Sequence, residues 1–245
     1  MTKSQLTKQH IGNTLKKLAE KTPLDKIAVQ EILDAGKISR KTFYYHFQDK
    51  QEVVVWIFRS ELAAVVEKSC DPIILENIEE PGKGDYARLP FYPNLFGSDP
   101  EMVFQSYFSS LLEYLYSNKI FYINAFQSTS QNNLGDYLNE LIYQYLLNDI
   151  NCLLAAHNIN DFEKEFVAQY FTCATAGTII TWVKNGMEGY PGNTFKYNYI
   201  LTPITTLCLE FYVNYLIEKQ NASEKSSKKH TGYLEKGSSL KFKSR

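Results

Sequence analysis

The segment SRKTFYYHFQDK, residues 39–50, holds three cations and four aromatic rings within twelve positions. A helix buried on all sides would not carry three cations, and a fully solvated helix would not carry four aromatic rings. The mixture therefore predicts an element that buries one face in a core and presents the opposite face to an anion.

This segment is expected to be a helix that begins after Ser39, because serine is a preferred N-cap residue. Phe43 and Phe47 lie four positions apart, so both rings fall on one helix face and are expected to anchor the helix. Asp49 is expected to cap the next helix, which Lys50 begins. The side chains between the two phenylalanines are left to the outer face.

The outer face has the chemistry of a DNA-recognition helix. The first turn of such a helix touches base edges, and tyrosine hydroxyls and ring nitrogens farther along can reach phosphate oxygens. The start of the following helix also favours a phosphate. We predict base contacts from Arg40, Lys41 and Thr42. Further contacts with DNA, chiefly with phosphates, are predicted from Ser39, Tyr44, Tyr45, His46 and Lys50.

Two helices are expected before this segment. Residues 5–21 carry an apolar stripe at helical spacing with lysines opposite, and Pro23 ends that helix. A second short helix is expected over residues 28–35, followed by a turn of about three residues. Two short helices in this order predict a helix-turn-helix, and residues 1–50 are therefore predicted to form a DNA-binding domain.

Residues 11–56 resemble the DNA-binding domain of the TetR/AcrR family of bacterial transcriptional regulators. The resemblance is carried by Thr42, the three aromatic residues at 43–45, the His46-Phe47 pair and Lys50. It implies an all-α homodimer that binds a palindromic double-stranded DNA operator and is a repressor released by a small-molecule ligand. Lys37 departs from the small residue, often glycine, of the family's turn, and would be mildly strained at positive φ.

The charge distribution supports a polyanion-binding front on a body that does not bind polyanions. Residues 1–60 hold eleven Lys and Arg against six Asp and Glu, a net charge of +5. Residues 61–220 carry a net charge of −11, and residues 221–245 carry +5. A net charge of +5 over sixty residues can also arise by chance. It supports DNA binding only together with the motif at residues 39–50.

The rest of the chain is predicted to be helical, which makes the fold class all-α. A helix from about residue 50 links the DNA-binding domain to a regulatory and dimerisation domain over residues 51–220. Residues 71–100 hold five of the eight prolines and are expected to be an irregular excursion, either a flap over a pocket or a plain insertion. Residues 221–245 are Ser/Lys-rich without periodicity and are expected to be a disordered basic tail.

The last two helices of the body are expected to form a homodimer interface. Ala174, Gly177 and Thr178 give a smooth face for close helix approach, and residues 197–219 carry an apolar stripe. Two such helices from each chain would make a four-helix interface. The alternative is that both helices belong to the core of a single chain.

The resemblance also implies an apolar inducer pocket within the body. Tyr107, Tyr122 and Trp182 are candidates to line it, because each combines a flat apolar surface with a hydrogen-bonding tip. An aromatic residue at helical spacing is more often part of a core than of a pocket. The identity of an apolar or aromatic ligand does not follow from the sequence.

Other classes of protein find little support in the sequence. The four cysteines are far apart and the histidines lack ligand spacing, so neither a metal nor another cofactor is expected. No GxSxG, HExxH or glycine-rich phosphate loop indicates an enzyme or catalytic residues. The run at 171–183 is too short to cross a membrane, which predicts a soluble cytoplasmic protein.

Two alternatives to the small-molecule-controlled repressor are open at this point. Some members of the family are activators, or respond to a protein co-regulator in place of a small molecule. The chain could also be a helical interaction module whose basic front is incidental, in which case its binding would not depend on salt.

Overall fold

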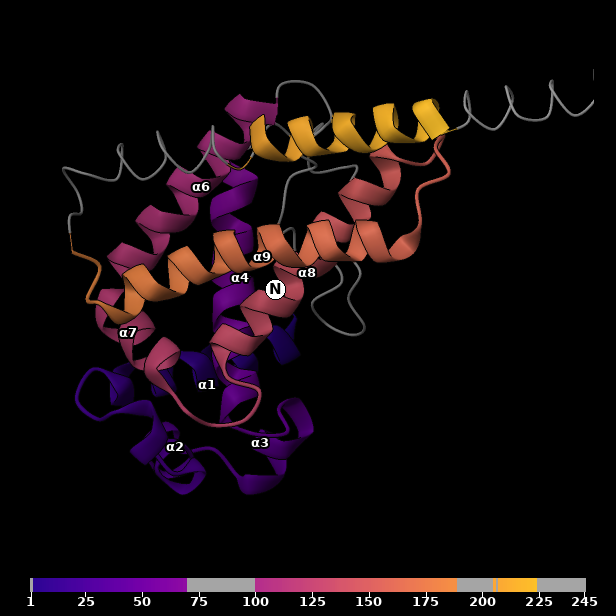
Figure 1. The fold of residues 1–245 in the computed structure, drawn as a ribbon. Coiled ribbons are helices and arrows are strands. Elements are labelled where there is room, and N and C mark those ends of the chain that lie inside the picture. Colours follow the sequence, from indigo (N-terminus) through magenta and orange to yellow (C-terminus); the bar gives the residue numbers. More distant parts are fainter. Residues whose placement is uncertain (1, 70–99, 189–204, 206, 224–245) are drawn as a thin grey trace, which may run out of the picture.

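The computed structural model describes residues 2–69, 100–188, 205 and 207–223. Within these ranges all regular structure is helical, which confirms the predicted fold class (Figure 1). Almost all of the predicted excursion at 71–100 and of the basic tail lies outside the described residues. The elements are α1 (Lys3–Ala19), η1 (Leu24–Lys26), α2 (Val29–Gly36), α3 (Arg40–His46), α4 (Lys50–Ser69), α6 (Pro100–Ser117), α7 (Lys119–Gln127), α8 (Leu134–Leu153), α9 (Asp161–Lys184) and a last helix over residues 207–223.

The head, defined as α1, η1, α2 and α3, lies at one end of the molecule (Figure 1). The body, defined as α4, α6 to α9 and the last helix, makes up the rest. Figure 1 shows α4 running from the head into the middle of the body. At about 1.5 Å per residue, its 20 residues span about 30 Å, which makes it the rod between the two parts.

A glycine sets the close approach of α1 and α4. A Cβ atom added to Gly12 would lie 3.0 Å from Ile57 Cγ1 and 3.2 Å from Trp56 Cζ3. The Trp56 ring in turn lies edge to face with the Phe47 ring, with 6.0 Å between centroids. The head core therefore joins α1, α3 and the first two turns of α4.

The turn between α2 and α3 places Lys37 at positive φ, the strained conformation considered in the sequence analysis. Lys37 lies in the left-handed region, with φ 51° and ψ 45°. The Ile38 N–H donates to the carbonyl oxygen of Leu33 at 2.9 Å, which is the closing bond of a Schellman motif. A residue with a Cβ atom adopts this conformation at a cost that glycine avoids.

Lys37→Gly should therefore raise the free energy of unfolding by about 1 kcal/mol, or about 2–4 °C in Tm for a chain of this size. Lys37→Ala is the matched control, because alanine also removes the lysine side chain but keeps the Cβ atom. A gain in thermal melting for both variants, or for neither, would contradict the role of backbone strain.

The long helix α9 crosses the body beside α8. It includes the apolar run at 171–183, which by itself is too short to span a membrane. The whole helix is longer, with 24 residues. By length and composition it could cross a membrane, but half of its most apolar window is buried inside the protein. A core helix of a soluble protein passes the same test, and α9 packs on α8 in this way.

The last helix runs antiparallel to α9, as Figure 1 shows. Near its C-terminal end Lys219 Nζ lies 2.6 Å from Glu163 Oε1, in the first turn of α9. The helix continues through residue 223, so its end overlaps the first three residues of the predicted tail. The predicted beginning at residue 197 lies outside the described residues.

Candidate nucleic-acid interface

Helix α3 is fixed at its start by the predicted N-cap. The Ser39 hydroxyl accepts a hydrogen bond from the Thr42 N–H at 3.0 Å and lies 2.7 Å from the Thr42 hydroxyl. Phe47 ends the helix in an extended conformation. Ser39 therefore shapes the first turn of α3, and its own hydroxyl is engaged within that turn.

The two faces of α3 sort as the sequence predicted. Phe43 is fully buried and Phe47 is 2% exposed, so one face belongs to the head core. On the opposite side Tyr45 is 81% exposed and Tyr44 is 49% exposed. The Tyr45 ring packs edge to face on the His46 ring at 4.9 Å between centroids. A rigid helix thus carries two accessible phenol groups.

The cations in the first turn of α3 are accessible. Arg40 and Lys41 are exposed, and Thr42 is half-buried. Arg40 Nη2 donates to Gln30 Oε1 of α2 at 3.3 Å, which directs the guanidinium along the helix-turn-helix. This long contact uses one of the five N–H donors of the guanidinium group, which suits bidentate contacts with a base or a phosphate.

Lys50 lies in a different environment from the one that the sequence suggested. Its Nζ donates to the carbonyl oxygens of Leu24 and Ile27, each at 2.7 Å, and lies 3.4 Å from that of Asp25. Burial lowers the pKa of Lys50. The ammonium therefore fastens η1 to the first turn of α4, and its contact with a phosphate stays a prediction. Backbone acceptors leave no mark in a sequence, so this arrangement could not have been foreseen.

A cluster of polar contacts between head and body was not anticipated either. The Asp25 carboxylate, in η1, accepts hydrogen bonds from the hydroxyl of Ser128, from the N–H and hydroxyl of Thr129, and from the hydroxyl of Ser130. These three residues form the loop after α7. Hydrogen bonds from Ser128 and then from the Thr129 N–H lower the pKa of Asp25. The consecutive hydroxyl residues at 128–130 are the only sign of this contact in the sequence.

A second polar contact joins α1 to the body. Lys16 Nζ lies 2.8 Å from both carboxylate oxygens of Glu61 in α4 and 2.9 Å from Asn118 Oδ1. The Tyr114 hydroxyl donates to Glu61 Oε2 at 2.9 Å and is hydrogen-bonded to the Tyr122 hydroxyl. Burial raises the pKa of both tyrosines. We call this set the Lys16–Glu61 network.

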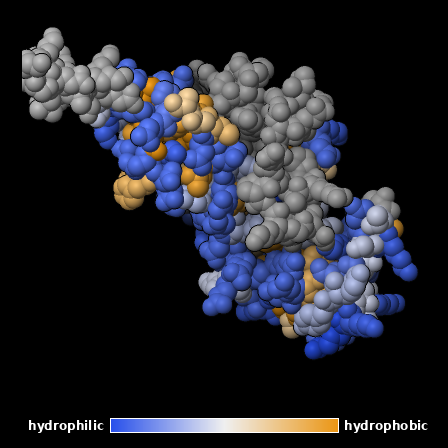
Figure 2. All heavy atoms as spheres, turned by 90° about the vertical axis from the view of Figure 1, so that its right-hand side faces the viewer, coloured by the Kyte–Doolittle hydropathy of each residue, from blue (hydrophilic) through white to orange (hydrophobic). Residues whose placement is uncertain are grey.

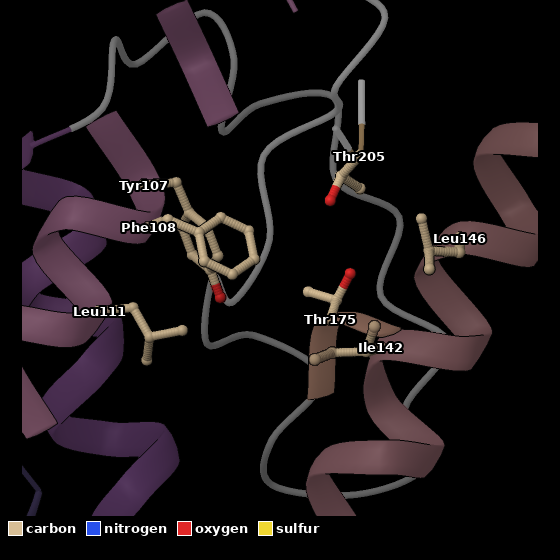
Figure 3. Close-up of a pocket in the computed structure, with 7 residues that line it drawn as sticks. All are labelled: Tyr107, Phe108, Leu111, Ile142, Leu146, Thr175 and Thr205. Carbon is tan, nitrogen blue, oxygen red and sulfur yellow. The ribbon is translucent and has the colours of Figure 1, made fainter. Parts of the chain in front are cut away.

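The three candidate ligand residues do not come together. Tyr122 is fully buried in the Lys16–Glu61 network, and Trp182 lines a shallow groove along α9. Tyr107 does line an enclosed cavity, together with side chains of α6, α8 and α9 (Figure 3). Figure 3 shows Thr175 and Thr205 facing each other across this cavity. Its volume of about 10 Å³ is enough for about one water molecule.

Comparisons with known proteins agree with this architecture. Residues 103–197 match the family model of a TetR-type transcriptional regulator C-terminal region. A 71-residue stretch, 29% of this chain, is 34% identical to the HTH-type dhaKLM operon transcriptional activator DhaS of Lactococcus lactis subsp. lactis (strain IL1403). That match spans 38% of the relative's own length.

One solved structure shows the same fold. The dihydroxyacetone kinase operon activator DhaS aligns with a TM-score of 0.50 at 21% identity, over 84% of this chain and 97% of that chain. RolR without ligand aligns with a TM-score of 0.44 at 15% identity, over 83% of this chain and 89% of that chain, a likeness too loose to carry an argument. The family model and the partial sequence match together support a TetR-type transcriptional regulator.

The Asp25 cluster predicts a pH-dependent contribution to stability. Asp25→Ala should lower the free energy of unfolding by about 1 kcal/mol near neutral pH, because the variant lacks the acceptor of the loop after α7. The folded-state pKa of Asp25 lies below its ordinary value of 3.8, so its contribution is complete above about pH 4 and is lost as the pH falls through the lowered pKa.

Urea denaturation of both proteins at pH 6 and pH 3 measures this contribution. The difference between wild type and variant should shrink at pH 3. A difference of equal size at both pH values would show that the carboxylate charge does not stabilise the contact.

Proposed function

We propose that this regulator binds duplex DNA by placing the first turn of α3 in the major groove. The proposal rests on one observation, a short helix anchored by Phe43 and Phe47 whose opposite face is accessible. Helix-turn-helix proteins present the N-terminal residues of such a helix to base edges. Binding to DNA implies that the protein works in the cytoplasm of its cell.

Roles in the interface follow from the position of each side chain on α3. Arg40, Lys41 and Thr42 read bases from the first turn. Tyr44, Tyr45 and His46 contact phosphates from the outer face. Ser39 acts mainly as the cap of the helix. Lys50, at the start of α4, holds η1 and is proposed to contact a phosphate as well.

A homodimer is the assembly proposed to read the operator. Exposed aromatic and apolar side chains recur every four residues along both helices of the antiparallel pair. On α9 they are Phe162, Phe166 and Tyr170, and on the last helix Leu207, Phe211 and Tyr215. We call these residues the aromatic stripes. Figure 2 shows hydrophobic residues at the surface of the body, on the side away from the head.

The aromatic stripes are better suited to a partner than to water. Phe162 and Phe211 are each 74% exposed, a costly position for a phenylalanine in a monomer. A second copy of the chain would cover both helices and form a four-helix interface. In such a dimer the two α3 helices would read half-sites about 34–36 Å apart.

Control of DNA binding would pass through the contacts between head and body. The Asp25 cluster and the Lys16–Glu61 network hold the head in one orientation relative to α4, α6 and α7. A ligand or partner that favours another arrangement of the body would change the separation of the two α3 helices. DNA affinity would change by the same coupling free energy.

For the controlling event we propose two candidates. The first is an apolar or aromatic ligand that enlarges the cavity lined by Tyr107 and Thr175 and releases a repressor from its operator. The Thr175 hydroxyl is buried there without a hydrogen-bond partner among the described residues, which suits a ligand that carries a polar group.

The second candidate is a transcriptional activator controlled by a protein co-regulator. Its support is the small volume of the cavity and the activator name of the Lactococcus relative. Transcription from the chain's own upstream promoter, in vitro with and without the protein, separates the two. If the protein is a repressor, its addition should reduce the amount of transcript. If it is an activator, its addition should increase that amount.

Substitutions on α3 should separate base reading from phosphate contact. Arg40→Ala should weaken binding to the specific site by about 1–3 kcal/mol and leave binding to an unrelated duplex almost unchanged. Tyr45→Phe should weaken both duplexes alike, because a phosphate carries no sequence information. Fluorescence anisotropy with the chain's own upstream DNA and a scrambled duplex measures both.

Lys68→Ala is the matched control for this series, since Lys68 is an exposed cation at the far end of α4. It should bind both duplexes like the wild type. If Arg40→Ala also binds like the wild type, or reduces both duplexes equally, α3 does not read bases through Arg40.

Charges placed in the aromatic stripes should dissociate the dimer. Phe166→Glu combined with Phe211→Glu is expected to give a monomer in analytical ultracentrifugation at micromolar concentration, since four carboxylates would face each other per dimer. Ile120→Glu is the control, because Ile120 is 59% exposed on α7, outside the stripes. If the double variant is still a dimer, the dimer interface does not lie on the aromatic stripes.

A further inference from the structure

A groove at the junction of head and body carries chemistry that DNA binding does not use. It has a volume of about 510 Å³, within the usual range of small-molecule sites. One side is the start of α4 and the residues just before it. The other side is the start of α8. The groove is lined by Gln48, Asp49, Gln51, Glu52, Val55, Asn132, Asp136, Tyr137 and Glu140.

The groove is strongly acidic. It holds four carboxylates, two on each side, and the described residues that line it include no Lys, Arg or His. The hydrogen bonds to these carboxylates come from neutral groups. Asp49 accepts from the N–H of Glu52 at 2.8 Å, and Asp136 accepts from Asn133 Nδ2 at 2.9 Å. These contacts orient the carboxylates without a charged donor. Among the described residues, the positive charges at the edge of the groove are the Lys50 ammonium, which attracts Asp49, and the Arg59 guanidinium, which donates to the Tyr137 hydroxyl at 2.9 Å.

Gln51 supplies an independent feature of the groove. It is only 5% exposed, and its Nε2 donates to the Ser128 hydroxyl at 3.2 Å. Its Oε1 is buried and has no hydrogen-bond partner within the described part of the chain. An unpaired amide oxygen costs free energy that a donor entering the groove would recover. A ligand with an N–H group that reaches Gln51 Oε1 would satisfy this oxygen.

The arrangement of the carboxylates favours a long organic cation over a metal ion. No three acidic, histidine or cysteine residues of the described chain come close enough together to hold a metal. A chain with several separate ammonium groups can instead meet the Asp49–Glu52 side and the Asp136–Glu140 side together. Tyr137 and Val55 offer apolar surface for the methylene segments between such groups.

We propose that this groove binds a small linear polyamine, a molecule with two or more ammonium groups joined by methylene chains. One ammonium lies against Asp136 and Glu140, and another donates to Gln51 Oε1 beside Asp49 and Glu52. The bound polyamine bridges the start of α4 and the start of α8, next to the Ser128 contact with Asp25. It therefore fastens the junction between α3 and α4 to α8, outside the cavity that Tyr107 lines.

Isothermal titration of the full-length protein with spermidine, without DNA and at constant ionic strength, tests the proposal. Wild type should bind one spermidine per chain. Asp136→Asn combined with Glu140→Gln should weaken binding about tenfold, because two charge-assisted contacts are lost and the side-chain shapes are kept. Gln51→Met should weaken it about threefold through loss of the amide oxygen.

Two controls separate a site from general attraction to an acidic protein. Glu67→Gln with Glu113→Gln removes the same charge from exposed positions outside the groove, and should bind spermidine like the wild type. Magnesium chloride at equal concentration should not displace spermidine. Equal weakening by both double variants, displacement by magnesium, or no saturable binding would overturn the proposal.

Discussion

Burial of the Phe43 and Phe47 rings in the head core is the constraint on which the proposed interface depends. It fixes which side of α3 faces outward, and so places Arg40 and Tyr45 where duplex DNA can reach them. Without this anchor a seven-residue helix would not hold its shape in water. The Gly12 contact with α4 completes the same core by letting α1 approach closely.

The head and the body are joined by polar contacts as well as by α4. Apolar packing tolerates small rotations, whereas a carboxylate held by several donors has a defined orientation. Asp25 and the Lys16–Glu61 network therefore give the head a preferred position, and in the proposed control a change in the body that breaks either contact would release it. The acidic groove lies beside the first of these contacts, through Gln51 and Ser128.

Local sequence patterns predicted the fold and the two faces of α3, whereas contacts distant in sequence escaped them. The Ser39 cap and the i, i+4 phenylalanines act within one helix, so their outcome follows from spacing alone. Lys50 binds carbonyl oxygens 23 to 26 positions away, and Asp25 binds a loop more than 100 positions away. Tyr122 is a core residue because it lies in the Lys16–Glu61 network, whose members come from four different helices.

The central claim is that the exposed face of α3 meets the phosphates and bases of duplex DNA. The most direct measurement is the affinity for the chain's own upstream DNA between about 50 and 200 mM salt. If lysine and arginine side chains of the protein displace counterions from DNA, the logarithm of the binding constant should fall linearly with the logarithm of the salt concentration. The expected slope is about −3 or steeper for a dimer. An affinity that does not change with salt would contradict the account.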